Sequence, residues 1–307
     1  MIRSLLTMLA VVLLCACSDS QPEMAEQNAV YYWRTELRLD SGERAFLAQH
    51  HIKKVYCRYF DVVMGDDVVP VPNATIAFSD TLPAGVELVP TVYITEDCMH
   101  QRHEGLAERI VRRILQMNET NDIYGVSELQ IDCDYTSNSR RIYYEFLKEV
   151  ANEWSHLSPY PSHHSPHIST TIRLHQLSMP APPVDYGVLM LYNTGDPRKF
   201  LDLRSADGRL LEEGKNPVLD IRDVMPYVRR LDDYALPLAA AYPVYLWVRN
   251  ISGVRVEHFV EADEILRVKQ AVEKKRPELS RTIITYHLDK ENINRYKPET
   301  YESIYHH

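Results

Sequence analysis

Eight short apolar segments lie along the chain from residue 30 onward, and segments with a helical repeat of apolar positions separate most of them. Uninterrupted apolar runs of this length are typical of parallel strands that are buried on both faces. Eight strand–helix units in a chain of this length predict an α/β fold, a single closed (β/α)8 TIM-type barrel. The expected strands span residues 30–37, 54–62, 86–94, 128–134, 167–174, 187–193, 236–242 and 282–289.

Three connections depart from the strand–helix rhythm. Residues 64–82, which follow the second strand and contain several prolines, predict a long loop or a small hairpin. Residues 244–249 and 254–260 flank a glycine-containing turn and predict a β-hairpin after the seventh strand. A proline-rich link replaces a full helix before the sixth strand. An open doubly wound sheet is the alternative architecture, but no glycine-rich phosphate loop follows the first strand, which disfavours its nucleotide-binding versions.

The N-terminus combines a short basic start with an apolar run from Leu5 to Leu14, too short to span a bilayer as a helix. The tetrapeptide Leu14-Cys15-Ala16-Cys17 follows it and resembles the lipobox of bacterial lipoproteins. The resemblance implies a signal peptide over residues 1–16, a lipid on Cys17, a tether over residues 17–28 and a barrel domain over 29–307. It implies an anchor in the bacterial outer membrane, facing the periplasm or the cell surface. An ordinary secretory signal with an incidental cysteine is the alternative.

The net charge bears on the kind of partner, and the cysteine content bears on disulfide bonding. The formal net charge of −9 becomes −10 when Arg3 leaves with the signal peptide, which argues against a nucleic-acid partner. Beyond Cys17 the chain holds Cys57, Cys98 and Cys133, an odd number at scattered spacing, so no disulfide framework is expected. Cys57 and Cys133 fall out of phase with the polar residues of their strands, which predicts buried, inert thiols.

The candidate chemistry centres on residues 128–136, where an alternating strand ends in Asp132 and Asp134. Side chains two residues apart share one face of a strand, so both carboxylates point the same way. Strand interiors seldom carry acids, because an unpaired buried charge is costly. The carboxyl ends of the strands are where a (β/α)8 barrel keeps its active site. One alternative is structural: Asp132 pairs with Arg58 inside the barrel.

Other strand ends also carry polar or aromatic residues, and all should meet at one mouth of the barrel. Asp132, Asp134 and Tyr192 are the residues expected to carry catalysis. The residues expected to bind substrate are Trp33, Arg58, Asp61, Asn193, Tyr242 and Tyr286. No cofactor or metal is expected, because the histidine cluster at positions 163, 164 and 167 lies before the fifth strand, at the opposite end.

Asp132, Asp134 and the run from Met190 to Asn193 resemble the strand-four and strand-six motifs of glycoside hydrolase family 18 barrels. The chain as a whole, from Trp33 to Asp289, resembles uncharacterised glycoside-hydrolase-like barrel lipoproteins of Bacteroidetes. The resemblance implies a carbohydrate ligand, an oligosaccharide outside the cytoplasm.

The sequence departs from the family at two positions. The family's proton-donating Glu is Thr136 here, and the strand-six Asp is Asn193. Threonine is no general acid near neutral pH, and the loss of a general acid costs about 10²–10⁴-fold in rate. Whether the chain is an enzyme therefore stays open. Either Glu36, Asp61 or Asp289 supplies the proton, or the barrel is an inactive glycan- or protein-binding domain.

Overall fold

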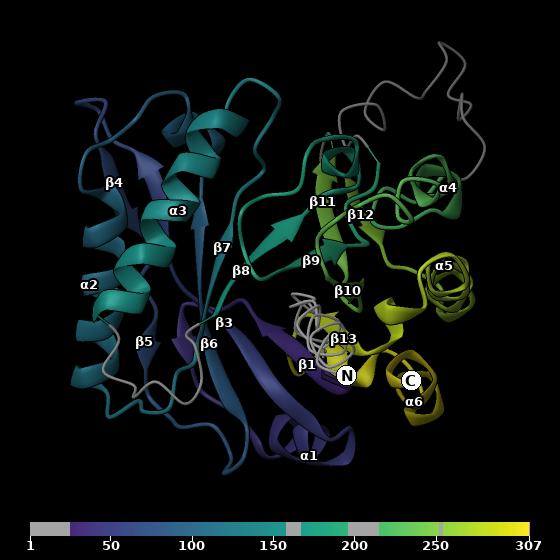
Figure 1. Ribbon diagram of the computed structural model, residues 1–307. Helices are drawn as coiled ribbons and strands as arrows, with labels where there is room; N and C mark the ends of the chain where they lie inside the picture. Colours follow the sequence, from purple (N-terminus) through teal and green to yellow (C-terminus); the bar gives the residue numbers. More distant parts are fainter. Residues whose placement is uncertain (1–24, 158–166, 196–214, 252–253, 307) are drawn as a thin grey trace, which may run out of the picture.

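The computed structural model describes residues 25–157, 167–195, 215–251 and 254–306, and these form a closed barrel (Figure 1). Eight parallel strands pair in a ring, and the first pairs with the last, which confirms the expected (β/α)8 barrel. In ring order the strands are β1 Gln27–Tyr32, β3 Ile52–Met64, β6 Glu87–Ile94, β7 Glu128–Asp132, β8 His167–Ile172, β9 Tyr186–Met190, β10 Leu238–Pro243 and β13 Thr282–Tyr286.

Helices surround the ring of strands on the outside (Figure 1). They are α1 Ser41–Gln49, α2 Leu106–Thr120, α3 Arg140–Leu157, α4 Ile221–Val228, α5 Ala262–Lys275 and α6 Pro298–Tyr305. Four short 3-10 turns complete the connections: η1 Glu96–Met99, η2 Leu174–Ser178, η3 Pro277–Ser280 and η4 Asn292–Asn294. The apolar stripe of α2 shows how the packing arises, because Leu106, Ile110 and Ile114 recur at helical spacing and are all buried.

Five of the expected strands, 30–37, 128–134, 167–174, 187–193 and 282–289, extend beyond the observed strand ends. The segment 30–37 divides into β1 and the short strand β2 Glu36–Leu37, which leaves the barrel and pairs with β5 Ala77–Phe78. The last strand stops at Tyr286, so Asp289 lies beyond it. One further strand and one hairpin lie outside the ring of parallel strands. Strand β4 Pro70–Asn73 folds back antiparallel on the long β3, and β11 Trp247–Ile251 pairs with β12 Val254–His258 in a hairpin.

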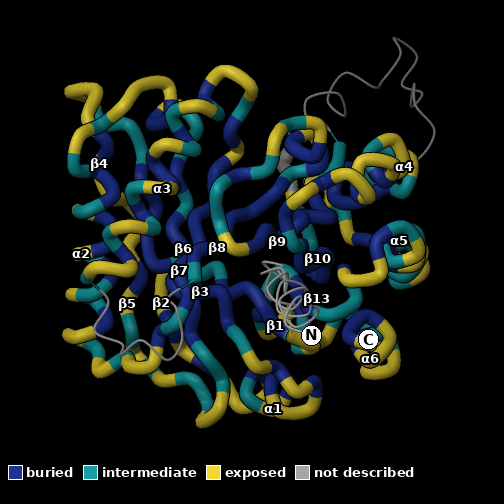
Figure 2. The backbone as a smooth tube through the Cα atoms, in the orientation of Figure 1, coloured by how far each residue is buried: buried dark blue, intermediate teal, exposed yellow. Residues whose placement is uncertain are grey.

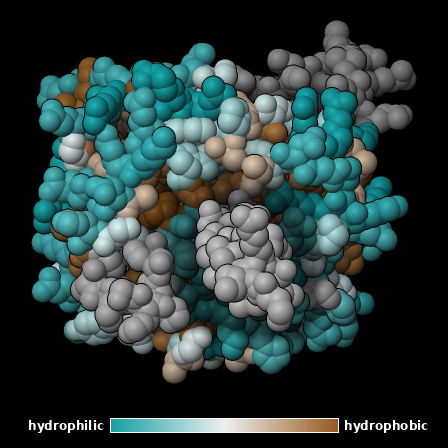
Figure 3. All heavy atoms as spheres, in the orientation of Figure 1, coloured by the Kyte–Doolittle hydropathy of each residue, from teal (hydrophilic) through white to brown (hydrophobic). Residues whose placement is uncertain are grey.

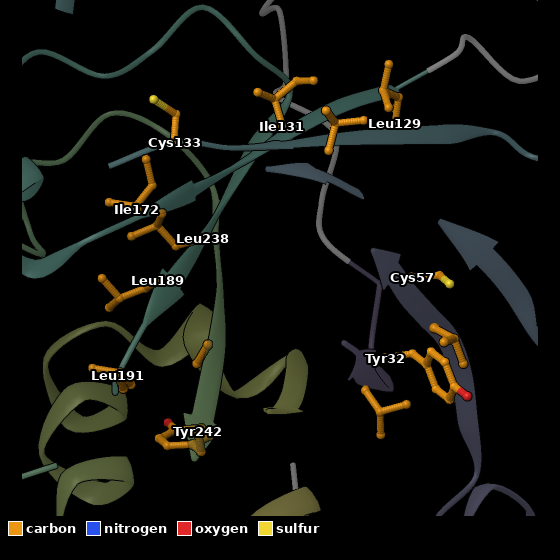
Figure 4. Close-up of a cluster of buried hydrophobic side chains, with 14 of the residues drawn as sticks. Tyr32, Cys57, Leu129, Ile131, Cys133, Ile172, Leu189, Leu191, Leu238 and Tyr242 are labelled. Carbon is orange, nitrogen blue, oxygen red and sulfur yellow. The ribbon is translucent and has the colours of Figure 1, made fainter. Parts of the chain in front are cut away.

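The barrel strands are buried along nearly their whole length (Figure 2), and successive side chains point to opposite sides of the barrel wall. One set of side chains packs between the strands and the helices; Figure 4 shows part of this outer cluster, including Leu189, Leu191 and Tyr242. The alternate set fills the interior of the barrel. The hydroxyls of Tyr56 on β3 and Tyr186 on β9 meet at 2.6 Å although these strands are not neighbours, so both rings cross the inside.

Hydrophilic residues cover most of the described surface on the face seen in Figure 3. Among the described residues, no helix has the length and apolar character needed to cross a membrane. The expected buried thiols of Cys57 and Cys133 are confirmed, and Cys98 is also free and buried; burial raises the pKa of each.

A polar layer closes the interior near the amino-terminal ends of the strands. Glu128, which is fully buried, accepts hydrogen bonds from Ser169 at 2.6 Å and from Tyr186, and its other oxygen lies 2.7 Å from Nζ of Lys54. Burial lowers the pKa of Lys54, but attraction to Glu128 and Glu87 outweighs it, so the pKa is raised. The barrel therefore carries a fixed, fully bonded ion pair at its base.

Replacing Lys54 with Met should cost about 3–5 kcal/mol of unfolding free energy, because the buried Glu128 carboxylate loses its cation. The double variant Lys54→Met/Glu128→Gln should lose clearly less, since no charge is then stranded. Urea unfolding of the three proteins measures both. Equal losses in the single and double variants would show that the pair does not act as a unit.

Candidate functional site

Two aspartates and one arginine form the centre of the barrel mouth. Asp132 ends β7, Asp134 follows two residues later, and Arg173 follows β8, the neighbouring strand. Oδ1 of Asp134 accepts a hydrogen bond from Nε of Arg173, and Oδ1 of Asp132 lies 3.5 Å from Nη2 of the same guanidinium. Thr171 donates a hydrogen bond of 2.6 Å to Asp132. Both carboxylates thus point into the mouth, as expected, and a single cation binds them.

The two carboxylates differ in their access to solvent. The side chain of Asp132 is 5% exposed and that of Asp134 is 49% exposed. Burial raises the pKa of Asp132, the charge of Asp134 adds to the rise, and Arg173 opposes it. Burial alone would lower the pKa of Arg173, but the two carboxylates raise it well above its ordinary value. Asp134 is therefore the carboxylate that a ligand can reach, and Asp132 supports it from beneath.

Arg58 does not pair with Asp132, so the structural alternative drawn from the sequence is wrong. Nε of Arg58 lies 2.7 Å from Oδ1 of Asp61, and a second bond joins Nη2 to Oδ2. Residues three apart face opposite sides of a regular strand, but the register of β3 against β6 shifts between Arg58 and Phe60. This bulge turns Asp61 back onto the face of Arg58 and lets the pair close.

Aromatic rings form the facing wall of the mouth. Tyr192 and Tyr286 stack with centroids 4.7 Å apart, and Trp33 lies 5.8 Å from Tyr286. Tyr31 and Tyr245 extend the group, at 5.6 Å and 5.4 Å from Tyr286. The guanidinium of Arg58 lies 5.6 Å from the Trp33 ring centre, which joins the wall to the charged residues.

A cavity of about 500 Å³ lies beside the ion pair, and of the rings in this wall Tyr192 lines it. Asp134, Arg173, Tyr192 and Asn193 contribute to its lining. The Tyr192 hydroxyl is buried, and within the described part of the chain no group forms a hydrogen bond with it. Asn193 adopts a left-handed backbone conformation and accepts a hydrogen bond of 2.5 Å from the hydroxyl of Tyr245. The cavity therefore combines an exposed carboxylate, an amide and an unpaired hydroxyl.

Tyr242 is not part of the mouth, although the sequence placed it among the substrate-binding residues. Its neighbours Ala239 and Ala241 face the interior of the barrel, so Tyr242 faces outward into the outer cluster of Figure 4. It is fully buried there. A position near the end of a strand puts a residue at the level of the mouth. It does not determine whether the side chain points into the barrel or out toward the helices.

Thr136, at the position of the family's acid, takes part in the first turn of α3. Its hydroxyl donates to Glu96 at 2.9 Å and accepts from the backbone of Asn138 at 3.2 Å, and its own N–H bonds to Ser139. Burial raises the pKa of Glu96, but hydrogen bonds from Ser139, Thr136 and His100 outweigh it, and the pKa is lowered. Glu96 therefore stays ionised near neutral pH and holds the loop rather than supplying a proton.

The structure also shows where the other candidate acids lie and what they contact. Asp61 is bound by Arg58, Asp289 accepts a hydrogen bond from the backbone N–H of Glu291 at 2.9 Å, and Glu36 lies on β2, outside the barrel ring.

Among the residues that the structure describes, no three metal-binding side chains cluster. Of the histidine cluster, positions 163 and 164 lie outside the described residues, and His167 pairs with Asp185 at the start of β8.

Sequence reasoning missed Arg173 and the rings of Tyr31 and Tyr245. The signal for Arg173 was present: it follows Ser169 and Thr171 at two-residue spacing, so it shares their inward face directly after the end of the fifth strand of the barrel. Tyr245 lies in residues 244–249, which the sequence assigned to the hairpin after the seventh strand, but it precedes the first hairpin strand, β11, and joins the mouth instead.

No protein-family model and no curated protein matches the sequence. Solved structures do match. The Bacillus cereus spore cortex-lytic enzyme SleL is 14% identical, with a TM-score of 0.53 over 92% of this chain and 74% of its own. A GH18 chitinase from Cycas revoluta, in complex with (GlcNAc)3, is 9% identical, with a TM-score of 0.53 over 91% of this chain and 99% of its own. A chitinase-like agglutinin from Robinia pseudoacacia is 11% identical, with a TM-score of 0.57 over 90% and 99%.

At these identities the likeness establishes the fold. The expected distant resemblance to family 18 barrels is confirmed at the level of the fold.

Replacing Arg173 with Met should destabilise the protein more at pH 7.5 than at pH 5. Without the cation, the folded-state pKa of Asp132 rises further above its unfolded value of about 3.9. A raised folded pKa gives stability that is present below the unfolded pKa and lost as pH rises through the folded pKa. A loss of about 3–5 kcal/mol is expected at the higher pH, measured by urea unfolding.

The double variant Arg173→Met/Asp132→Asn is the matched control, and the extra loss at pH 7.5 should disappear in it. If the single variant loses the same free energy at both pH values, Arg173 does not neutralise Asp132.

Proposed function

We propose that this chain is a membrane-anchored glycan-binding barrel that does not hydrolyse its ligand by the family 18 route. The observation that carries the proposal is the binding of both mouth aspartates by Arg173. In this arrangement the carboxylates recognise and position a ligand instead of exchanging protons with it.

The lining of the mouth supports a carbohydrate ligand. Sugars present apolar C–H faces that pack on aromatic rings, and hydroxyls that bond to carboxylates, amides and phenols. Tyr192 offers a ring in the lining of the cavity, with Tyr286 stacked on it and Trp33 next to Tyr286, and Asp134 and Asn193 offer acceptors in the same lining. The Cycas chitinase of the same fold was solved with (GlcNAc)3, and the Robinia protein is described as an agglutinin.

The chain lacks the proton-donating carboxylic acid of family 18 hydrolases at the position that the sequence resemblance assigns to it. Cleavage of a glycosidic bond needs a carboxylic acid beside the leaving oxygen. The sequence resemblance assigns that position to Thr136, whose hydroxyl is used in the turn before α3. The lowered pKa of the adjacent Glu96 removes the nearest replacement acid.

One observation favours a hydrolase instead, namely the raised pKa of Asp132 beside Asp134. Two coupled carboxyls with separated pKa values can divide the acid and base roles. Asp132, however, is almost completely enclosed and bound by Thr171 and Arg173, so a substrate would have to displace Arg173 to reach it.

The proposed anchor rests on the lipobox-like tetrapeptide ending at Cys17. Residues 1–24 lie outside the described residues, so this part of the proposal stands on the sequence alone. A lipid on Cys17 would hold the barrel at the bacterial outer membrane, on the periplasmic or the cell-surface side.

Asp134→Asn and Tyr192→Phe should each weaken glycan binding by about 1–3 kcal/mol, because each change removes or weakens a hydrogen bond to the ligand. A glycan array identifies the ligand, and calorimetry on the best oligosaccharide measures the affinities. Tyr242→Phe is the matched control, since it removes a phenol outside the mouth and should leave affinity unchanged. Wild-type affinity in both mouth variants would place the ligand elsewhere.

The same oligosaccharides should show no hydrolysis by the wild type. Thr136→Glu should not gain turnover, since the new carboxylate would face Glu96 and break the turn before α3. A measurable wild-type rate that Asp134→Asn abolishes, with the fold intact, would establish the hydrolase interpretation instead.

Cys17→Ala should release the protein from the membrane fraction, because the acylated residue is lost. Cys15→Ala is the matched control: Cys15 leaves with the signal peptide, so that variant should partition like the wild type. Fractionation and immunoblotting measure both. An unchanged membrane association of Cys17→Ala would refute the anchor.

A further inference from the structure

The chain enters the barrel at the end opposite the mouth. The N–H of Gln27, the first residue of β1, bonds to the carbonyl of Arg281 at 2.8 Å. The hydroxyl of Thr282, the first residue of β13, donates to the carbonyl of Ala25 at 2.9 Å. These bonds fix residues 25–27 at the amino-terminal ends of the strands, and any tether to Cys17 must leave from that end.

The ligand-binding groups lie at the other end of the same strands. Trp33 follows the end of β1, Asp134 follows β7 and Tyr286 ends β13. With six residues in β1 and a rise of about 3.3 Å per residue, roughly 20 Å separates the entry point from the mouth. The helices and loops around the strands lengthen any path along the outer surface.

The tether is short compared with this height. Seven residues lie between Cys17 and Ala25, which makes eight Cα–Cα steps and a reach of about 29 Å at full extension. A random chain of that length spans roughly 16 Å, less than the height of the strands. Bringing the mouth to the bilayer would require a tether extended beyond this random span along the side of the barrel, which is entropically unfavourable.

We propose that the anchored protein stands with the amino-terminal ends of its strands toward the bilayer and its mouth toward the aqueous side. The proposal rests on the anchor at Cys17 described above. It also restricts the ligand: the mouth meets glycans that approach from the aqueous phase, and not the headgroups of the leaflet that holds the lipid.

Two exposed lysines provide a matched pair of labelling positions. Lys53 is the second residue of β3, near the chain entry, and Lys290 follows β13 at the rim of a recess that Trp33 also lines. Because Cys57, Cys98 and Cys133 are buried, a maleimide donor dye should react with Lys53→Cys or Lys290→Cys and little else.

The lipidated full-length variants are reconstituted into vesicles that carry an acceptor dye on their lipids. We expect a larger loss of donor fluorescence from position 53 than from position 290. Equal or larger loss from position 290 would overturn the orientation. Flotation of the same vesicles separates the two ideas: protein that does not float refutes the anchor and the orientation with it, whereas floating protein with the reverse pattern refutes only the orientation.

Insertion of about 30 flexible residues after Ser20 tests whether the short tether sets the orientation of the barrel. A tether of that length spans roughly 34 Å, more than the height of the strands, so the difference between the two labels should shrink. A difference that stays unchanged with the long tether would show that contact of the barrel surface with lipid, and not tether length, sets the orientation. That result would overturn the argument given above.

Discussion

The geometry of the mouth depends on the neutralisation of charge inside a closed barrel. Asp132 and Asp134 project from one strand into a space that water barely reaches at its lower end, and Arg173 projects from the next strand into the same space. Two carboxylates without a cation would repel each other and pull water inward. With Arg173 between them, the lower carboxylate can be enclosed while the upper one stays available.

Beneath the mouth, the barrel interior is filled by polar contacts that cross it. The phenol of Tyr31 donates to Gln130 at 2.9 Å, and Tyr56 meets Tyr186 above the Lys54–Glu128 pair. Small residues such as Ala239 and Ala241 on β10 leave room for these long side chains. A tyrosine can fill volume with its ring and satisfy a buried polar group with its hydroxyl, so one residue type meets both requirements of this interior.

The fold and half of the site could be predicted because both depend on local patterns. Continuous apolar runs identify parallel strands, and the spacing of Asp132 and Asp134 fixes a common face. The pairing of Arg58 with Asp61 could not be predicted, since it depends on a bulge that the register with β6 creates. The outward direction of Tyr242 could not be predicted, because its neighbours in the strand are all apolar. The sequence therefore does not show which alternate residues of this strand point into the barrel. Arg173 could have been found by extending the inward phase of β8 by one residue.

The unpaired hydroxyl of Tyr192 has a consequence for selectivity. A buried polar group without a partner already costs free energy in the empty protein, so a ligand group that bonds to it relieves that cost as well as adding a contact. A ligand that fills the same space with a methylene group would leave the cost in place. Sites of this kind reject analogues that lack the matching polar group far more strongly than sites that rely on shape. For the proposed glycan ligand, deoxygenation at the carbon nearest this phenol would therefore be a more severe change than a change in chain length, and a series of monodeoxy analogues would locate the sugar position in question.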